Sequence, residues 1–369
     1  MARIRRPEVT LIDDPDIQEK EEVELEDETD ESLPITYSIT SYGADYPVDG
    51  LVKRIEKGDI YVPPFQRGYT WVLSKASRFI ESLLLGLPVP GIFLAAEANT
   101  RKLLVIDGQQ RLRTLQYFYK GVIAERSQAF SLSGLKSSFD GSTYERLSPE
   151  DRRRLDDSIM HATIVRQDQP SDDDSSIYEI FSRLNTGADL LQPQEIRACM
   201  YHGPFNDLLH RLNKNQDWRA IFGPESRRMR DQELVLRVFA LMNWRDRYKR
   251  PMKEFLNKFM KKHRNIDEET ERAFIDSFQS SIKAIRLGAG DRAFRPARAL
   301  NAAVYDAVMI GIMTRLAQLP IKDFDLLGKQ YRNLLEGQDF TQLTQSRTTD
   351  ETIVAERIKL AIEVFSKLT

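Results

Sequence analysis

The sequence predicts an α+β fold, in which a small mixed sheet with helices is followed by an all-helical C-terminal part. Short apolar runs of strand type occur only before residue 200, where they alternate with segments of helical period. Beyond residue 200 nearly every segment has the period of a helix, so strands are expected in the first half alone. Glycine and proline break these later segments, at Gly203-Pro204, Gly223-Pro224, Gly288 to Gly290 and Pro320.

The first half offers helices and strands in alternation. Apolar residues at helical spacing predict helices at residues 48–57, after Ser74 as N-cap, from Gln109 to Tyr119, after Ser148-Pro149, at 177–184 and after Gln192-Pro193. Short apolar runs predict strands at residues 60–62, 92–96, 102–106 and 161–166, with a turn at Asn99-Thr100. Residues 124–148 are polar and poorly periodic, which predicts a loop-rich excursion.

Composition excludes several kinds of protein. A chain of 369 residues, 41% of them hydrophobic, can bury a large core. Its most apolar stretch, Ala299 to Met313, is interrupted by Asn301 and Asp306, so it predicts a core helix and no membrane span. Acids follow the basic start where a secretory signal would be apolar, which favours a cytoplasmic location. The one cysteine, Cys199, precludes an intrachain disulfide and is expected to pack in the core.

Charge divides the chain near residue 34. Residues 1–34 hold 13 acids against 4 bases, a net charge of −9, and the remaining residues carry +7. So acidic a segment with few apolar residues is predicted to be disordered. It acts either as a solubilising arm or as a segment that competes for a basic groove.

A predicted strand ends at Asp107, and Gly108 separates it from a predicted helix. That helix begins with Gln109, Gln110 and Arg111. The first N–H groups of a helix have no intrahelical partner and carry the positive end of its dipole, which suits a phosphate-sized anion. Arg111 adds a fixed charge, and Asp107 can orient a sugar hydroxyl, a water or a hydrated metal ion. Because glutamine is no strong base, chemistry here would depend on positioning water and stabilising phosphate charge. An ordinary strand-to-helix connection is the alternative.

A proline-containing segment rich in aromatic and arginine side chains follows the first predicted strand. Arg67 is expected to provide a second phosphate contact, and Gln66 can hydrogen-bond a base or sugar. Tyr69 or Trp71 can stack on a base. Alternatively these aromatic rings form a wedge in the core, because large aromatic side chains are usually buried.

Residues 211–264 hold 16 lysines and arginines against 6 acids. Such clustering is typical of proteins that contact the phosphate backbone of DNA, although a solvated basic face of a helical bundle is the alternative. No reading helix is recognisable, so no sequence specificity is predicted. The expected DNA contacts are Arg227, Arg228, Arg230, Arg245, Arg247, Lys249 and Arg250, with Arg237 as a further arginine of the group.

Three motifs follow one another in order within residues 40 to 240: Val62-Pro63-Pro64-Phe65-Gln66-Arg67-Gly68-Tyr69-Thr70-Trp71, Ile106-Asp107-Gly108-Gln109-Gln110-Arg111, and Ile180 to Gly187 with Glu195-Ile196-Arg197. This set resembles the N-terminal domain of GmrSD-type restriction systems, a family that also includes the SspE sensor of phosphorothioate-marked DNA. The resemblance implies a ParB/sulfiredoxin-like fold in which the first two motifs cradle nucleotide phosphates. Together with the charge and helical patterns, it divides the chain into a disordered acidic tail at 1–34, a nucleotide-binding domain at 35–200 and a helical domain at 201–369.

In this family the second motif is associated with hydrolysis of an NTP, often GTP, coupled to action on modified or foreign DNA. The resemblance implies GTP or ATP as substrate and leaves the use of Mg²⁺ open. It assigns hydrolysis to Asp107, Gln109, Gln110 and Arg111. It assigns nucleotide binding to Gln66, Arg67 and Gly108, with Asn185 as a neighbour. Tyr69 and Arg113 are also expected to bind the nucleotide.

Relatives commonly continue into an HNH-type nuclease, which needs a histidine base and metal ligands. The last of the four histidines here is His263, so no nuclease centre is expected. The first hypothesis is an NTP-hydrolysing component of a restriction or anti-phage defence system, with DNA or a partner nuclease as effector. The sequence does not determine whether the protein forms an oligomer. Two alternatives are a nucleotide-gated DNA- or protein-binding module without turnover, and a phosphotransfer enzyme acting on a small molecule or a side-chain hydroxyl.

Overall fold

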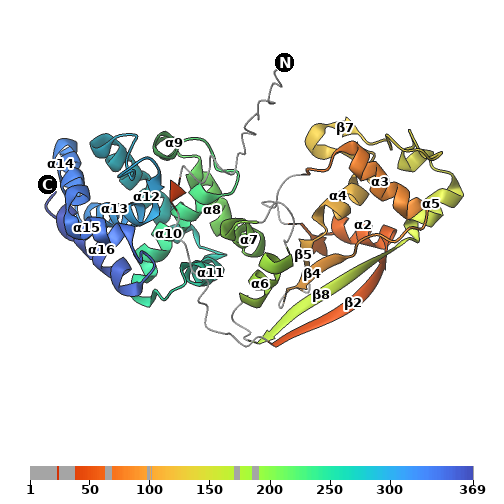
Figure 1. Cartoon of the computed structure of the whole chain (residues 1–369), viewed down its shortest axis with the longest axis horizontal. Coiled ribbons are helices and arrows are strands. Elements are labelled where there is room, and N and C mark those ends of the chain that lie inside the picture. The colour runs from red at the N-terminus through yellow and green to blue at the C-terminus, as the bar shows by residue number, and fades with distance from the viewer. Residues whose placement is uncertain are drawn as a thin grey trace, which may run out of the picture. The chain divides into compact units, whose positions relative to one another are not determined.

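The computed structural model in Figure 1 describes residues 23–24, 38–62, 69–97, 100, 102–169, 175–184 and 191–368. The chain divides into two compact units. The sheet unit is Leu33–His202, and the helical unit is Gly203–Thr369 together with Met1–Ser32. The predicted α+β class is confirmed, because a mixed five-stranded sheet with helices precedes a region in which helices dominate.

The sheet has the strand order β2-β8-β4-β5-β3. Its strands are β2 (Ser38–Pro47), β3 (Ile60–Tyr61), β4 (Ile92–Ala96), β5 (Leu103–Asp107) and β8 (Ile159–Gln169). Strand β5 runs parallel to β3 and antiparallel to β4, β4 runs parallel to β8, and β2 runs antiparallel to β8. The central strands β4 and β5 are nearly continuous apolar runs, as expected of strands covered on both faces.

Helices pack against this sheet and form its core. They are α2 (Val48–Glu56), α3 (Leu73–Leu84), α4 (Gln109–Lys120), α5 (Pro149–Asp156), α6 (Ser175–Leu184) and α7 (Pro193–Met200). Leu51, Ile80, Leu115 and Phe118 from the first three of these helices are fully buried in one cluster. Burying each such side chain contributes about 1.5–3 kcal/mol. The predicted excursion at 124–148 holds two 3₁₀ turns and the short strand β7 (Gln128–Ala129), which pairs with β6 (Val122–Ile123).

The helical unit is built around one buried helix, α13 (Ala302–Leu316), which confirms the predicted core helix. Helices α10 (Arg230–Trp244), α12 (Glu268–Ala289) and α16 (Glu351–Phe365) pack against it. The helices of this unit are α8 (Pro204–Asn213), α9 (Gln216–Phe222), α10 (Arg230–Trp244), α11 (Met252–His263), α12 (Glu268–Ala289), α13, α14 (Phe324–Glu336), α15 (Gln338–Gln345) and α16 (Glu351–Phe365). None of the helices in the described part of the chain is long and apolar enough to cross a membrane.

Several elements differ from the predictions. Strand β2 was not predicted, and β8 extends beyond 161–166 at both ends. The N-cap of α3 is Val72, so the predicted cap at Ser74 is wrong. Strands are not confined to the first half, because β1 (Val23–Glu24) pairs in parallel with β9 (Leu300–Asn301). The predicted disorder of residues 1–34 therefore does not hold at β1, and the rest of that segment lies outside the described residues.

His263 belongs to an aromatic cluster of the helical unit. Its ring stacks on Phe259 at 4.0 Å between ring centroids and lies 5.5 Å from Trp244. The Nδ1–H group of His263 donates to the carbonyl of Phe259 at 2.9 Å. Burial lowers the pKa of His263 below its ordinary value of 6.5.

The lowered pKa makes the stability of the helical unit depend on pH. The stability contributed by neutral His263 is complete above pH 6.5 and is lost as the pH falls from there through the lowered pKa. We expect the urea midpoint to decrease between pH 7.5 and pH 5.5 more in the wild type than in His263→Gln. An identical decrease in both proteins would contradict this role.

Candidate functional site

The turn between β5 and α4 requires glycine. Gly108 has φ 98° and ψ 8°, in the left-handed region that disfavours side chains. A Cβ atom at this position would lie 2.4 Å from Cγ2 of Ile92 on β4, so there is also no space for one. Gly108 is the N-cap of α4 and offers that helix no side-chain cap, and the first turn of α4 holds no acidic residue. Gly108 is buried against Ile92, and the start of α4 beside it is electropositive.

Asp107 and Arg111 form an ion pair across this turn. Nη2 of Arg111 donates to Oδ2 of Asp107 at 2.6 Å. The Arg111 side chain is 16% exposed and that of Asp107 is 45% exposed, so the guanidinium is enclosed and the carboxylate faces solvent. Nε of Arg111 is buried without a hydrogen-bond partner. The pair thus offers an unused donor and a solvent-facing carboxylate at one helix start.

Gln110 fastens the upstream segment to α4. Its Oε1 accepts from the N–H groups of Thr70 at 3.0 Å and Trp71 at 3.3 Å. On the other side of residues 63–68, Tyr61 is paired in parallel with Leu104. The chain on both sides of residues 63–68 is therefore tied to β5 and α4. The predicted site residues Gln66, Arg67 and Asn185 lie outside the described residues.

Tyr69 is a core residue, which corrects its predicted stacking on a base. Its side chain is 6% exposed, and its hydroxyl lies 2.9 Å from Oγ1 of Thr114. The edge of the neighbouring Tyr117 ring meets it at 5.1 Å, and the guanidinium of Arg126 lies 5.7 Å from its centroid. Trp71 is half-buried and packs edge-to-face on Phe79. The alternative of an aromatic wedge in the core therefore describes Tyr69.

The remaining predicted residues of the turn lie on one face of α4. Gln109 and Arg113 are both half-buried and stand four residues apart, so helix geometry places their side chains one above the other. This face is distinct from the one on which Gln110 holds Thr70. Sequence reasoning did not distinguish the two glutamines, because the hydrogen bonds of Gln110 with Thr70 and Trp71 come from a distant part of the chain.

Residues 48–202 match the family model of the GmrSD restriction endonuclease, N-terminal domain. This segment is a GmrSD-type N-terminal domain. The match begins at the first residue of α2, ends at the last residue of the sheet unit and includes the turn from Asp107 to Arg111. It associates the chain with restriction systems. No curated protein matches the chain.

Gly108 should be irreplaceable in the GmrSD-type domain. Gly108→Ala combines left-handed strain with overlap on Ile92, and we expect it to lower the free energy of unfolding by about 3 kcal/mol. Gly121 at the other end of α4 is the matched control, because its φ is 70° and the space that a Cβ would enter is open to a distance of 4 Å. Gly121→Ala should therefore lower the free energy by only about 1 kcal/mol. Equal losses in urea unfolding would contradict the close approach to Ile92.

The residues predicted to contact DNA lie outside the GmrSD-type domain and form two groups. Arg227, Arg228 and Arg230 precede or open α10, and the second group follows that helix. Since α10 has 15 residues, the groups stand about 22 Å apart along its axis. They are therefore two patches on one unit. Arg228 is 8% exposed and Arg237 is 2% exposed. The prediction that these two arginines contact the DNA backbone is therefore corrected, because both are buried in the helical unit.

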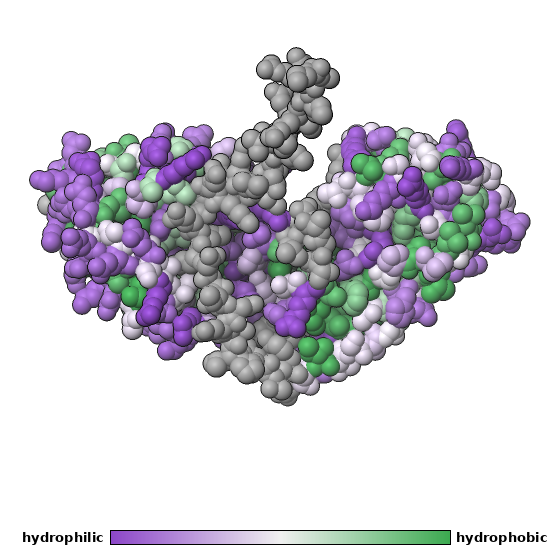
Figure 2. All heavy atoms as spheres, in the orientation of Figure 1, coloured by the Kyte–Doolittle hydropathy of each residue, from purple (hydrophilic) through white to green (hydrophobic). Residues whose placement is uncertain are grey.

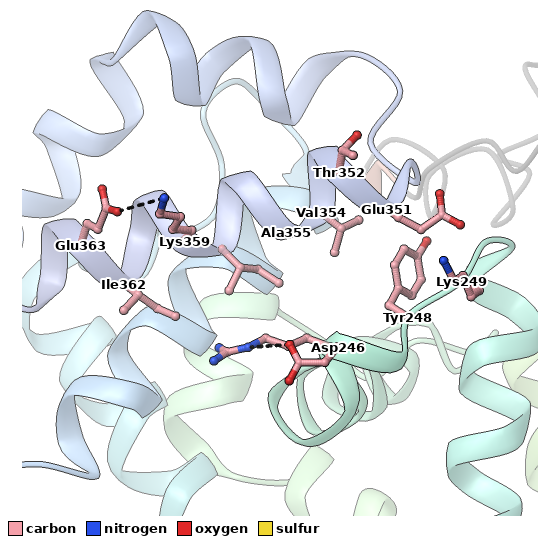
Figure 3. A pocket seen from close by; sticks show the side chains of 12 residues that line it. Asp246, Tyr248, Lys249, Glu351, Thr352, Val354, Ala355, Lys359, Ile362 and Glu363 are labelled. Carbon is pink, nitrogen blue, oxygen red and sulfur yellow. Dashed lines mark ion pairs between the residues drawn. The ribbon is translucent and has the colours of Figure 1, made fainter.

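The second group, Arg245, Arg247, Lys249 and Arg250, is exposed. Nη1 of Arg250 pairs with Asp350 at 3.2 Å, and the Arg247 guanidinium lies 5.5 Å from the Trp244 ring centroid. Arg245 and Lys249 line a cavity of about 670 Å³ against α16, shown in Figure 3. Hydrophilic side chains cover most of the face of the helical unit seen in Figure 2. Among the described residues no group of three or more His, Cys, Asp and Glu side chains suits a metal ion.

Proposed function

We propose that the GmrSD-type domain binds a nucleoside triphosphate at the turn from Asp107 to Arg111 and hydrolyses it, within a restriction or anti-phage defence system whose effector is DNA or a partner nuclease. The turn geometry carries this proposal. A left-handed Gly108 turns the chain into a 12-residue helix whose first turn holds no acidic residue, and an enclosed guanidinium stands at that helix start. Phosphate oxygens accept hydrogen bonds from backbone N–H groups and from guanidinium groups.

Each side chain of the turn has a distinct part in this proposal. Arg111 binds phosphate oxygens, with its unpartnered Nε as an available donor. Asp107 faces solvent and orients a ribose hydroxyl, a water or a hydrated Mg²⁺ ion. Gln109 positions the attacking water. Gln110 holds the upstream segment, because its side-chain oxygen accepts from the backbone N–H groups of Thr70 and Trp71. Arg113 lies on the same face of α4 as Gln109. Gln66, Arg67 and Asn185 stay predicted contacts of the nucleotide.

Phosphate release from GTP and ATP tests the hydrolysis. We expect Asp107→Ala to lower the rate at least about 100-fold, because orientation of the reacting groups is lost. Asp49→Ala is the matched control, since Asp49 forms the same i,i+4 pair with Lys53 at 2.7 Å on another helix of the sheet unit. Equal release by the wild type and Asp107→Ala, or no release with DNA supplied, would overturn the hydrolytic part.

A nucleotide-gated binding module without turnover is the second candidate. It is favoured by the hydrogen bonds of Gln110 with the backbone of Thr70 and Trp71, which tie the start of α4 to the upstream segment. In that case the ligand would alter the segment that Gln110 fastens. Tight nucleotide binding that is lost in Arg111→Ala, without measurable phosphate release, would select this candidate over the first.

A further inference from the structure

Strand β2 lies at one edge of the five-stranded sheet. The strand order β2-β8-β4-β5-β3 gives it one neighbour, β8, and Figure 1 shows it as the outermost strand. It has 10 residues, which is about twice the usual length of a strand. Within the described ranges of the chain, the backbone of β2 is paired in the sheet with β8 alone. Every second N–H and C=O group of β2 therefore points away from the sheet.

The sequence of β2 lacks the features that keep an edge strand from pairing. It contains no lysine or arginine, and its one proline, Pro47, is the last residue of the strand. The register of its ladder with β8 shifts only between Ser38 and Ile39, at the other end. Two of its larger apolar side chains are exposed, Ile39 by 40% and Tyr42 by 47%. The strand thus presents a long backbone edge to which a further strand can be added.

The geometry of antiparallel pairing selects one register between β2 and a second copy of itself. Two directly opposite residues either bond to each other or both point away, and these two kinds of pair alternate along the strands. A strand that pairs with its own copy therefore has one residue opposite itself. With Tyr42 in that position, residues 38–46 are all paired and Pro47 stays outside the ladder. With Gly43 in that position, Pro47 would enter the ladder, which proline disfavours.

The charge of β2 suits this register. Asp45 is the one charged residue of the strand, and it would lie opposite Ile39 of the second copy. The two Asp45 carboxylates would then stand about 20 Å apart along the strands. Oδ1 of Asp45 also lies 2.8 Å from Nδ1 of His161 in the same sheet. The two Tyr42 side chains would meet on one face, and cross-strand aromatic pairs stabilise a sheet. No like charges face each other.

We propose that two copies of this chain associate through β2, in antiparallel pairing about a two-fold axis at Tyr42, and so join their sheets into one continuous sheet. The inference goes beyond the proposed function. Strands β8 and β4 separate β2 from β5, at whose end the turn from Asp107 to Arg111 lies, so the turn takes no part in the pairing.

Tyr42→Lys in the full chain tests the pairing. It would place two lysines opposite each other at the axis, so sedimentation velocity should show a dimer dissociation constant at least about tenfold higher. Val122→Lys is the matched control, because Val122 is 44% exposed and lies on β6, in another sheet of the same unit. A wild type that stays monomeric up to about 100 μM would overturn the proposal. So would a Tyr42→Lys protein that dimerises as the wild type does.

Two further measurements separate the pairing from a folding defect. Tyr42→Glu alone should also be monomeric, whereas an equimolar mixture of Tyr42→Lys and Tyr42→Glu should dimerise again, because opposite charges then meet at the axis. In the wild type, amides of residues 38–46 should exchange about tenfold more slowly in concentrated than in dilute protein. Amides of β8 should exchange equally in both, since β8 already lies between β2 and β4.

A mixture of the two variants that stays monomeric would contradict the pairing. Exchange at residues 38–46 that does not depend on protein concentration would contradict it as well. None of these measurements uses a nucleotide or DNA, so failure of the proposed function would leave their results unaffected.

Discussion

Arg111→Ala should weaken the binding of a nucleoside triphosphate about 100-fold, a loss of about 2.7 kcal/mol. The Arg111 side chain is only 16% exposed, so its bonds to phosphate form away from bulk water. Truncating a charged donor in such enclosed surroundings typically removes about 2–5 kcal/mol of binding. Calorimetric titration of both proteins with the same nucleotide measures the difference.

Two further variants separate the phosphate contact from general charge. Arg154→Ala removes an arginine that also pairs at i,i+4, with Glu150 at 3.6 Å, and should leave the affinity unchanged. Arg111→Lys keeps the charge without the planar fork, so it should restore only part of the affinity. Full affinity in Arg111→Ala, in a protein whose urea unfolding is unchanged, would contradict the assignment.

Asp306→Ala should lower the free energy of unfolding of the helical unit by about 4 kcal/mol. Asp306 on α13 is fully buried and accepts from two arginines on two other helices. Nη2 of Arg237 lies 2.6 Å from Oδ2 of Asp306, and Nη2 of Arg357 lies 3.4 Å from the same oxygen. Removing the carboxylate leaves two buried guanidinium groups without their counter-ion, which explains why the effect exceeds that of an ordinary core truncation.

Asp246→Ala is the control for this second prediction. Its side chain is 97% exposed and its nearest pairing atom, Nε of Arg245, is 4.0 Å away, so no measurable change is expected. Urea unfolding followed by circular dichroism measures both variants. A loss below about 1 kcal/mol in Asp306→Ala would show that the three side chains are not interdependent.

The helices and strands that could be predicted are those marked by a local pattern in the sequence. The apolar run at 92–96 is β4 at the same bounds, and Ser148 is the N-cap of α5, where its Oγ accepts from the N–H of Asp151. Strand β2 was missed because most of its side chains are exposed and its sequence lacks apolar alternation. What forms β2 is its pairing with β8, more than a hundred residues away, and no local pattern records that contact.

In the candidate site too, local features could be predicted from the sequence and distant contacts could not. The turn at Gly108 could be predicted because strand, glycine and helix start are adjacent in the sequence. The anchoring role of Gln110 depends on Thr70 and Trp71, about forty residues earlier, and therefore needed the structure. Likewise the sequence records the charge of Arg237 but not its burial, which results from Asp306 on a different helix.

The central claim is that the turn from Asp107 to Arg111 binds the phosphates of a nucleotide. Calorimetric titration of the full chain with the triphosphate, diphosphate and monophosphate of guanosine and of adenosine tests it most directly. We predict saturable binding of at least one triphosphate at one site per chain, with affinity that decreases as each phosphate is removed. Binding that does not depend on the number of phosphates, or no binding of either triphosphate at millimolar concentration, would contradict the account.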